Sequence, residues 1–199
     1  MSKPTLEFWY EFSSPYCYLT AKRIAELANE KGFVVDWKPF LLGAVFKAEN
    51  RDAPVSIPAK AKYMRRDMLR KSKNLGYPYK WPDTFPTFAL VPARIGTAIH
   101  GEPWEADFIK GIFELYFEQG VDISGKDPAP IQALLERLGA PVAEIFAKLE
   151  QAEFKDALKQ NTDKAIEIGI FGAPMFFAKG EMFWGDESLE EAVDHLLND

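Results

Sequence analysis

The chain has 199 residues, of which 47% are hydrophobic, and its sixteen Phe and five Trp exclude a disordered protein. Thirty acidic against twenty-four basic residues give a net charge of −6, which argues against a nucleic-acid binder because phosphate neutralisation needs a basic surface. One cysteine, Cys17, excludes an intrachain disulfide and a cysteine-rich metal site, and with two histidines we expect no metal.

The N-terminal sequence predicts neither a signal peptide nor a membrane anchor. The apolar run Leu6–Phe12 is short and carries Glu7 and Glu11, whereas a signal peptide needs a longer uncharged stretch. No apolar run approaches the ~20 residues that cross a bilayer. We therefore expect a cytoplasmic protein without a membrane partner.

The first forty residues predict a strand, a helix and a second strand. Residues 6–12 form a near-continuous apolar run, typical of a strand that is buried on both faces. Ser14 and Pro15 then suit the N-cap and first position of a helix that runs to Gly32. Residues 33–40 return to an apolar strand pattern, and such a unit is parallel and right-handed in nearly all folds.

The segment from Lys47 to Lys80 is basic, with ten basic and three acidic residues. Residues 58–74 within it have apolar residues at helical spacing, so one interpretation is a solvated basic face on an amphipathic helix. The alternative is that part of this segment, near Lys47 and Lys60, faces an anionic ligand.

The rest of the chain predicts helices followed by a hairpin and a last helix. Proline starts and glycine ends predict helices over 86–100, 103–119, 130–138 and 141–168. Strands over 175–178 and 181–184 flank a Lys-Gly turn, and a helix follows residues 185–188. This order predicts an α/β domain of residues 1–45 and 169–199, interrupted by an all-α insertion of residues 46–168.

Two motifs place polar backbone and a hydroxyl where chemistry is possible. Ser14-Pro15-Tyr16-Cys17 lies at a strand-to-helix junction, where free helix N–H groups stabilise an anion. Ser14 is also explained as a plain N-cap. In Phe171-Gly172-Ala173-Pro174, a cis proline before an apolar strand would present the Ala173 backbone to a ligand, although Gly-x-Pro is a common turn.

In this order, with helices between them, the two motifs resemble the thioredoxin superfamily in its DsbA-type branch with a helical insertion. Ser14 stands where that superfamily has the attacking cysteine, and a hydroxyl cannot form a mixed disulfide. The Ser-Pro form is similar to the 2-hydroxychromene-2-carboxylate isomerases and the kappa-class glutathione transferases. The Leu42–Lys47 loop, the Pro58–Tyr63 helix start and the Phe183–Asp186 turn carry the same resemblance.

The resemblance implies a glutathione site, residue by residue. Ser14 matches the serine that hydrogen-bonds the sulfur, and Ala173 and Pro174 match the loop whose backbone pairs with the cysteinyl part. The remaining matches are Lys47, Asn50 and Lys60 near the glycine carboxylate, and Asp186 and Glu187 at the γ-glutamyl end. Ser188 stands where the family usually has an arginine.

The resemblance also implies the reaction. Glutathione, as cofactor, adds as a thiolate to a small aromatic carboxylate, 2-hydroxychromene-2-carboxylate, and is released when the trans-o-hydroxybenzylidenepyruvate product forms. Family members are commonly dimers, so we expect a homodimer. Trp9, Phe46, Trp81 and Phe85 are candidates for an apolar substrate pocket, although each is equally typical of core.

Three other functions remain open from the sequence. A kappa-like transferase or peroxidase shares the thiolate site and differs in its second substrate. A non-catalytic thioredoxin-fold binding module is compatible with Ser188. A thiol oxidoreductase acting through Cys17 lacks a partner cysteine, and we expect Cys17 to be inert core because free cysteines are usually buried. His100 and His195 are expected to be structural or exposed.

Overall fold

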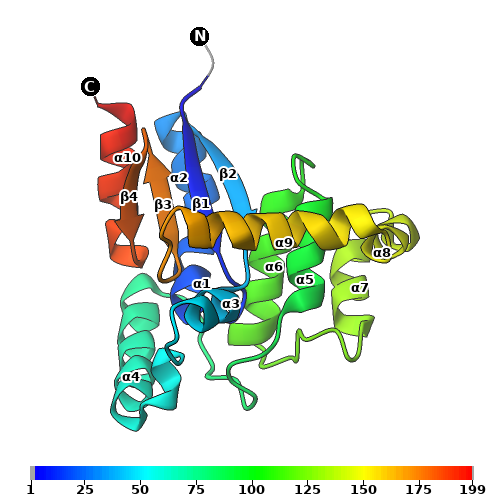
Figure 1. The fold of residues 1–199 in the computed structure, drawn as a ribbon, viewed down its shortest axis with the longest axis horizontal. Coiled ribbons are helices and arrows are strands. Elements are labelled where there is room, and N and C mark those ends of the chain that lie inside the picture. Colours follow the sequence, from blue (N-terminus) through cyan, green and yellow to red (C-terminus); the bar gives the residue numbers. More distant parts are fainter. Residues whose placement is uncertain (1–2, 199) are drawn as a thin grey trace.

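The computed structural model describes residues 3–198 and contains a four-stranded sheet in the order β2-β1-β3-β4 (Figure 1). The strands are β1 Thr5–Tyr10, β2 Val34–Pro39, β3 Met175–Ala178 and β4 Glu181–Trp184. β1 and β2 are parallel, while β3 is antiparallel to both β1 and β4. The β-α-β start and the β-β-α end confirm the predicted thioredoxin-like sheet.

The helices cover both faces of this sheet. α9 crosses one face, while α2 and α10 pack on the other, and α5–α8 gather beside the β2 edge (Figure 1). α4 lies apart, next to the start of α1. The bounds are α1 Pro15–Ala21, α2 Ile24–Lys31, α3 Leu42–Ala48, α4 Pro58–Leu75, α5 Leu90–Ala98, α6 Glu105–Phe117, α7 Ala129–Arg137, α8 Val142–Leu149, α9 Ala152–Glu167 and α10 Leu189–Leu197, with 3₁₀ turns η1 Pro54–Ser56 and η2 Asp186–Ser188.

Aromatic side chains on one face of β1 form the centre of the core. Phe8 is fully buried, and its ring centroid lies 5.4 Å from those of Tyr10 and Trp37 and 5.5 Å from that of Phe176. Such pairs add about 0.5–1.5 kcal/mol each beyond the burial of their area. Trp9, on the opposite face of β1, is 3% exposed, so the continuous apolar run reflects a strand covered on both faces.

Two predicted helices are each divided in the structure. The helix expected over 16–32 breaks between α1 and α2, because Arg23 has φ −132° and its side chain turns to Asp186 and Glu190. The helix expected over 141–168 breaks at Gln151, whose backbone is extended. The two single-helix predictions were therefore wrong. Neither break coincides with a glycine or proline, so the sequence pattern gave no sign of it.

Two further predictions need correction. The helix expected from Pro86 begins only at Leu90, since Thr87 bonds the Asp122 carboxylate and lies outside the helix. Residues 42–47, expected as a loop, form most of α3. The proposed division between residues 45 and 46 therefore falls inside a helix.

Candidate active site

Ser14 connects the two sequence motifs. Its backbone is extended, and its Oγ caps α1 by accepting the N–H of Cys17 at 3.4 Å. The same hydroxyl donates to the carbonyl of Ala173 at 3.0 Å, across 159 positions in the chain. The Ala173–Pro174 bond is cis. The expected meeting of the helix start and the proline loop is therefore present.

The proline loop also holds the turn that precedes α10. The Gly185 N–H donates to the Pro174 carbonyl at 3.0 Å. Within residues 3–198 the Ala173 N–H has no acceptor. A Cβ at Gly172 would lie 2.5 Å from Nε1 of Trp184, so a side chain there would displace the exposed Trp184 indole. The loop and the 185–188 turn thus form one unit beside Ser14.

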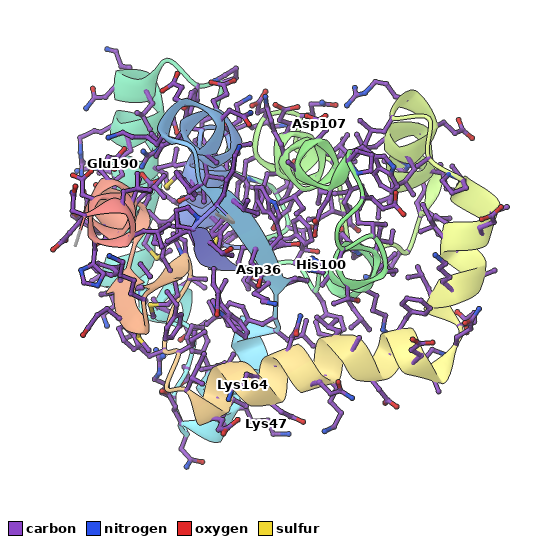
Figure 2. The ribbon with its side chains drawn as sticks, turned by 90° about the horizontal axis from the view of Figure 1, so that it is seen from above. Asp36, Lys47, His100, Asp107, Lys164 and Glu190 are labelled. Carbon is purple, nitrogen blue, oxygen red and sulfur yellow. The ribbon has the colours of Figure 1, made fainter. Side chains whose placement is uncertain are left out.

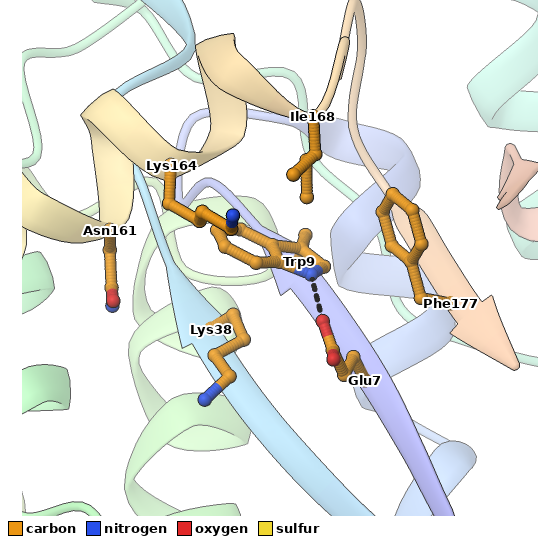
Figure 3. Close-up of a pocket in the computed structure, with 7 residues that line it drawn as sticks. All are labelled: Glu7, Trp9, Lys38, Asn161, Lys164, Ile168 and Phe177. Carbon is orange, nitrogen blue, oxygen red and sulfur yellow. Dashed lines mark hydrogen bonds between the residues drawn. The ribbon is translucent and has the colours of Figure 1, made fainter. Parts of the chain in front are cut away.

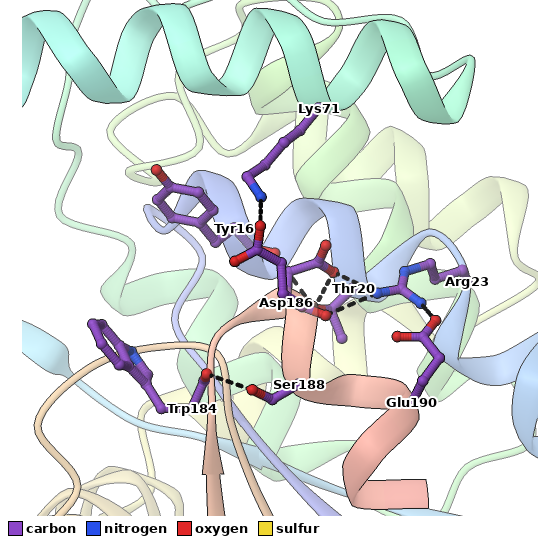
Figure 4. Close-up of polar contacts among 9 residues, drawn as sticks. Tyr16, Thr20, Arg23, Lys71, Trp184, Asp186, Ser188 and Glu190 are labelled. Atoms are coloured by element: carbon purple, nitrogen blue, oxygen red, sulfur yellow. Dashed lines mark hydrogen bonds and ion pairs between the residues drawn. The ribbon is translucent and has the colours of Figure 1, made fainter.

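Asp186 anchors that turn to α1 and α2 (Figure 4). It is buried, and its Oδ1 accepts the Thr20 hydroxyl at 2.9 Å and Nη2 of Arg23 at 3.0 Å. Burial raises the pKa of the Asp186 carboxyl, and the Arg23 guanidinium opposes that shift. A carboxylate that is bonded in this way is a structural support for the turn.

Glu187, the next residue, is exposed. Lys71 of α4 forms an ion pair with its carboxylate (Figure 4). Tyr16, which follows Ser14 by two residues, donates to Asp67 of α4 at 3.0 Å. Burial and the charge of Asp67 raise the pKa of the Tyr16 phenol.

Lys47, Asn50 and Lys60 are all exposed, and the structure does not bring them into contact with Ser14. Lys47 lies on α3 at the edge of the molecule, beside the part of α9 that carries Lys164 (Figure 2). Asn50 follows Glu49, the C-cap of α3, and has φ +53°, while Lys60 lies in the first turn of α4. Their side chains make no hydrogen bond or ion pair to any of residues 3–198.

Cys17 and the two histidines are placed as predicted. Cys17 is fully buried, and burial raises the pKa of its thiol well above the ordinary value. His100 lies 3.1 Å from Glu105 and 3.6 Å from Asp36, as Figure 2 shows for Asp36. The exposed His195 packs its ring 5.5 Å from that of Phe183. Neither histidine makes a hydrogen bond to Ser14, whereas the N–H of Cys17 does.

The four candidate pocket aromatics are packed against neighbouring residues. Trp9 lies in a cavity of about 330 Å³ beneath α9, where its indole N–H donates to Glu7 at 2.8 Å (Figure 3). Phe46 is buried. Trp81 packs on Phe85, with centroids 4.4 Å apart. The interpretation as core is confirmed for Trp9, whereas Phe46 is buried outside the core cluster, with Arg51 over its ring.

Sequence reasoning missed several groups around Ser14. The Glu11 carbonyl accepts the Ser14 N–H at 3.0 Å, and the Glu11 carboxylate accepts the Ser13 hydroxyl at 2.6 Å. Burial raises the pKa of Glu11 to about 7. Thr20, Arg23 and Lys71 were missed as well. Only Lys71 carried a signal, as part of the basic segment.

The residues from 3 to 198 hold no cluster of His, Cys, Asp and Glu that would bind a metal ion. In the same part of the chain no helix combines the length and apolarity needed to cross a membrane. What the site offers chemically is one hydroxyl, backbone polar groups and paired charges.

Comparisons with known proteins agree with this geometry. A family model of the DSBA-like thioredoxin domain matches residues 5–197. Glutathione S-transferase kappa 2 of Caenorhabditis elegans is 28% identical over 98% of this chain and 92% of its own. The 2-hydroxychromene-2-carboxylate isomerase of Sphingobium xenophagum is 23% identical over 98% of each chain.

A solved 2-hydroxychromene-2-carboxylate isomerase has the same fold. It superposes with a TM-score of 0.83 at 24% identity, covering 94% of this chain and 91% of its own. The sheet, the Ser14–Ala173 contact and these similarities lead to one assignment. The chain belongs to the DSBA-like thioredoxin domain family, among relatives that are 2-hydroxychromene-2-carboxylate isomerases and kappa-class glutathione transferases.

Proposed function

We propose that this protein is a glutathione-dependent enzyme that activates the glutathione thiol at Ser14. The carrying observation is the buried Ser14 hydroxyl, placed at the start of α1 and bonded to the carbonyl before the cis proline. The names of the relatives support a glutathione-dependent isomerase or transferase. The chain supplies no nucleophile of its own at this place.

Glutathione binding replaces the hydrogen bond between Ser14 and Ala173 with several bonds to the ligand. The Ser14 hydroxyl has a single hydrogen, which donates to Ala173 O in the free protein. When glutathione binds, that hydrogen turns to the sulfur. The Ala173 carbonyl then accepts the cysteinyl N–H, and the Ala173 N–H donates to the cysteinyl carbonyl. Every polar group that loses a partner thus gains one.

These contacts are strong enough to produce a thiolate. A free thiol has a pKa near 8.5, so about 3% is ionised at pH 7. Lowering that pKa by about two units needs roughly 2.7 kcal/mol of preference for the anion. A hydrogen bond to a charged group supplies about 1.5–3 kcal/mol, and the free N–H groups of the α1 first turn add to it.

For the isomerase reaction, the thiolate adds to a conjugated carbon of 2-hydroxychromene-2-carboxylate. The ring C–O bond opens, the former double bond becomes single and rotates, and elimination of the thiolate restores it as trans. Glutathione is regenerated, so the step consumes no oxidant or reductant. A kappa-like transferase on another electrophile uses the same thiolate and is the alternative, which the kappa 2 relative favours.

The experiment is turnover of 2-hydroxychromene-2-carboxylate, followed by absorbance, with and without glutathione. We expect turnover that requires glutathione and falls at least about hundredfold in Ser14→Ala. Ser124→Ala, which changes a half-buried loop serine that bonds Asp122, is the matched control. Glutathione-dependent consumption of a haloaromatic electrophile without isomerisation would favour the transferase. Turnover that is unchanged in Ser14→Ala would contradict the proposal.

We also propose that the protein acts in the cytoplasm as a homodimer, on a small aromatic carboxylate. The cytoplasm keeps glutathione reduced, and only the thiol form serves this mechanism. Sedimentation equilibrium tests the assembly, with a mass near twice the 22.6 kDa of the chain as the expected result. The two-part domain division remains a proposal, which limited proteolysis of the full chain tests.

A further inference from the structure

A cavity away from Ser14 lies between α9 and the sheet (Figure 3). Its volume is about 330 Å³, and small-molecule sites occupy roughly 300–1,000 Å³. The residues that line it come from β1, β2, β3 and the C-terminal half of α9. None of them belongs to the candidate active site, so a ligand in this cavity does not use the side chains proposed to hold glutathione.

The centre of the cavity is apolar. Trp9 of β1 is 3% exposed, and its indole forms the floor (Figure 3). Phe177 of β3 is the cross-strand partner of Glu7, which precedes Trp9 by two residues, so all three side chains share the face of the sheet toward α9. Ile168, which directly follows α9, is half-buried above them. These surfaces suit a flat aromatic group.

Two lysines lie at one side of the indole. Lys38 of β2 is the parallel partner of Trp9, and Lys164 reaches the cavity from α9. Figure 3 shows both lysines on the side of the indole away from Phe177. The strand order agrees, because β2 and β3 lie on opposite sides of β1. This side of the cavity is therefore cationic.

Both lysines keep donors for a ligand. An ammonium group has three N–H donors. Lys38 contacts Asp36 at 2.8 Å, and Lys164 donates to Glu167 at 3.0 Å. These carboxylates use one donor of each lysine, so two N–H groups on each remain for a carboxylate ligand that enters the cavity.

Glu7 lies on the other side of the indole, beside Phe177 (Figure 3). Its Oε2 accepts the Trp9 indole N–H at 2.8 Å. Its Oε1 has no hydrogen-bond partner among residues 3–198. A carboxylate oxygen accepts a hydroxyl hydrogen but repels an anion, so this side of the cavity suits a hydroxyl group.

We propose that this cavity binds a small hydroxylated aromatic carboxylate. The carboxylate accepts from Lys38 and Lys164, the ring packs on Trp9, and the phenolic hydroxyl donates to Oε1 of Glu7. The order of cations, apolar surface and acceptor across the cavity matches the order of carboxylate, ring and hydroxyl in such a molecule. An amino acid fits less well, because its ammonium and carboxylate are adjacent whereas the indole separates Glu7 from the lysines.

The test is calorimetric binding of trans-4-hydroxycinnamate and two analogues, with the Ser14 site saturated by S-methylglutathione. 4-Hydroxycinnamamide lacks the negative charge, and cinnamate lacks the hydroxyl. We expect each analogue to bind the wild type about tenfold more weakly. The amide loses its disadvantage in the Lys38→Met/Lys164→Met double variant, and cinnamate loses its disadvantage in Glu7→Met. Lys159→Met, which removes another exposed lysine of α9, is the matched control and behaves as wild type.

A second measurement locates the ligand in the wild-type protein. The indole ¹⁵N–H signal of Trp9, assigned by its loss in Trp9→Phe, is expected to shift as 4-hydroxycinnamate is added. An unchanged Trp9 signal at saturation, or equal affinity of the acid and the amide for the wild type, overturns the proposal. Absence of binding also overturns it and leaves thiol activation at Ser14 standing. Thermal unfolding of each variant confirms that it is folded.

Discussion

At the scale of single residues, the site depends on where one hydroxyl hydrogen points. The Ser14 hydroxyl donates to Ala173 while its oxygen accepts from Cys17. The family resemblance implied this meeting, because Ser14 and Ala173 both match parts of one glutathione site. The sequence does not predict Thr20 and Arg23 as partners of Asp186, since those contacts join residues more than 160 positions apart.

Glu11 predicts a pH-dependent stability. Its pKa is about 7 in the folded protein against 4.5 ordinarily. Between these values the unfolded chain releases the proton first, so this group stabilises the fold below pH 4.5 and loses that contribution as pH rises through about 7. We expect wild-type unfolding free energy to fall on the order of 2 kcal/mol more than that of Glu11→Gln between pH 5 and pH 8. Urea unfolding measures this, and parallel pH profiles would disprove it.

Arg23 predicts a structural effect at the turn. Arg23→Met leaves the buried Asp186 carboxylate with Thr20 alone, and we expect a loss of about 2 kcal/mol at pH 7. Lys31→Met is the control, because its exposed pair with Asp194 at 3.6 Å contributes less than about 1 kcal/mol. Equal effects of the two substitutions on urea unfolding would show that Asp186 does not depend on Arg23.

At the scale of elements, propensity and periodicity predicted the strands well and the helix interruptions poorly. The strands follow from apolar runs that need burial. The α1–α2 break follows from an ion pair between Arg23 and a distant turn, and the α8–α9 break has no local marker. Residues 42–47 form a helix although Gly43 lowers helix propensity.

The start of α1 retains the geometry for a dithiol. Residues 14 and 17 are one helical turn apart, and the Cys17 N–H donates to the Ser14 hydroxyl at 3.4 Å. We expect Ser14→Cys to form a disulfide with Cys17 on mild oxidation and to gain disulfide reductase activity. Thiol titration before and after oxidation checks this, with Ser14→Cys/Cys17→Ser as control. Two titratable thiols after oxidation would count against this geometry.

At the scale of the whole molecule, the sheet brings the two ends of the chain together and the helical segment supplies α4. Residues 14 and 173 meet because β1 lies between β2 and β3. The order of strands and helices along the sequence predicted this arrangement. It did not predict how α4 lies against the 185–188 turn, because that placement depends on the Tyr16–Asp67 and Lys71–Glu187 contacts.

We expect glutathione bound between the start of α1 and the proline loop to stabilise the folded protein. At a glutathione concentration of about 100 times Kd, linkage gives roughly 2.7 kcal/mol, or a Tm increase of about 5–10 °C for a chain of this size. Differential scanning calorimetry with glutathione, and with glycine as a control amino acid, measures it. The same Tm with both additions would be incompatible with a glutathione site.

The most direct test of thiol activation is ultraviolet difference absorbance at the thiolate band during glutathione titration, between pH 6 and pH 8. We predict a signal that saturates in the wild type and is lost in Ser14→Ala, because the Ser14 hydroxyl supplies the hydrogen bond that favours the anion. Binding without a thiolate signal, or an equal signal in both proteins, would contradict the assignment of Ser14.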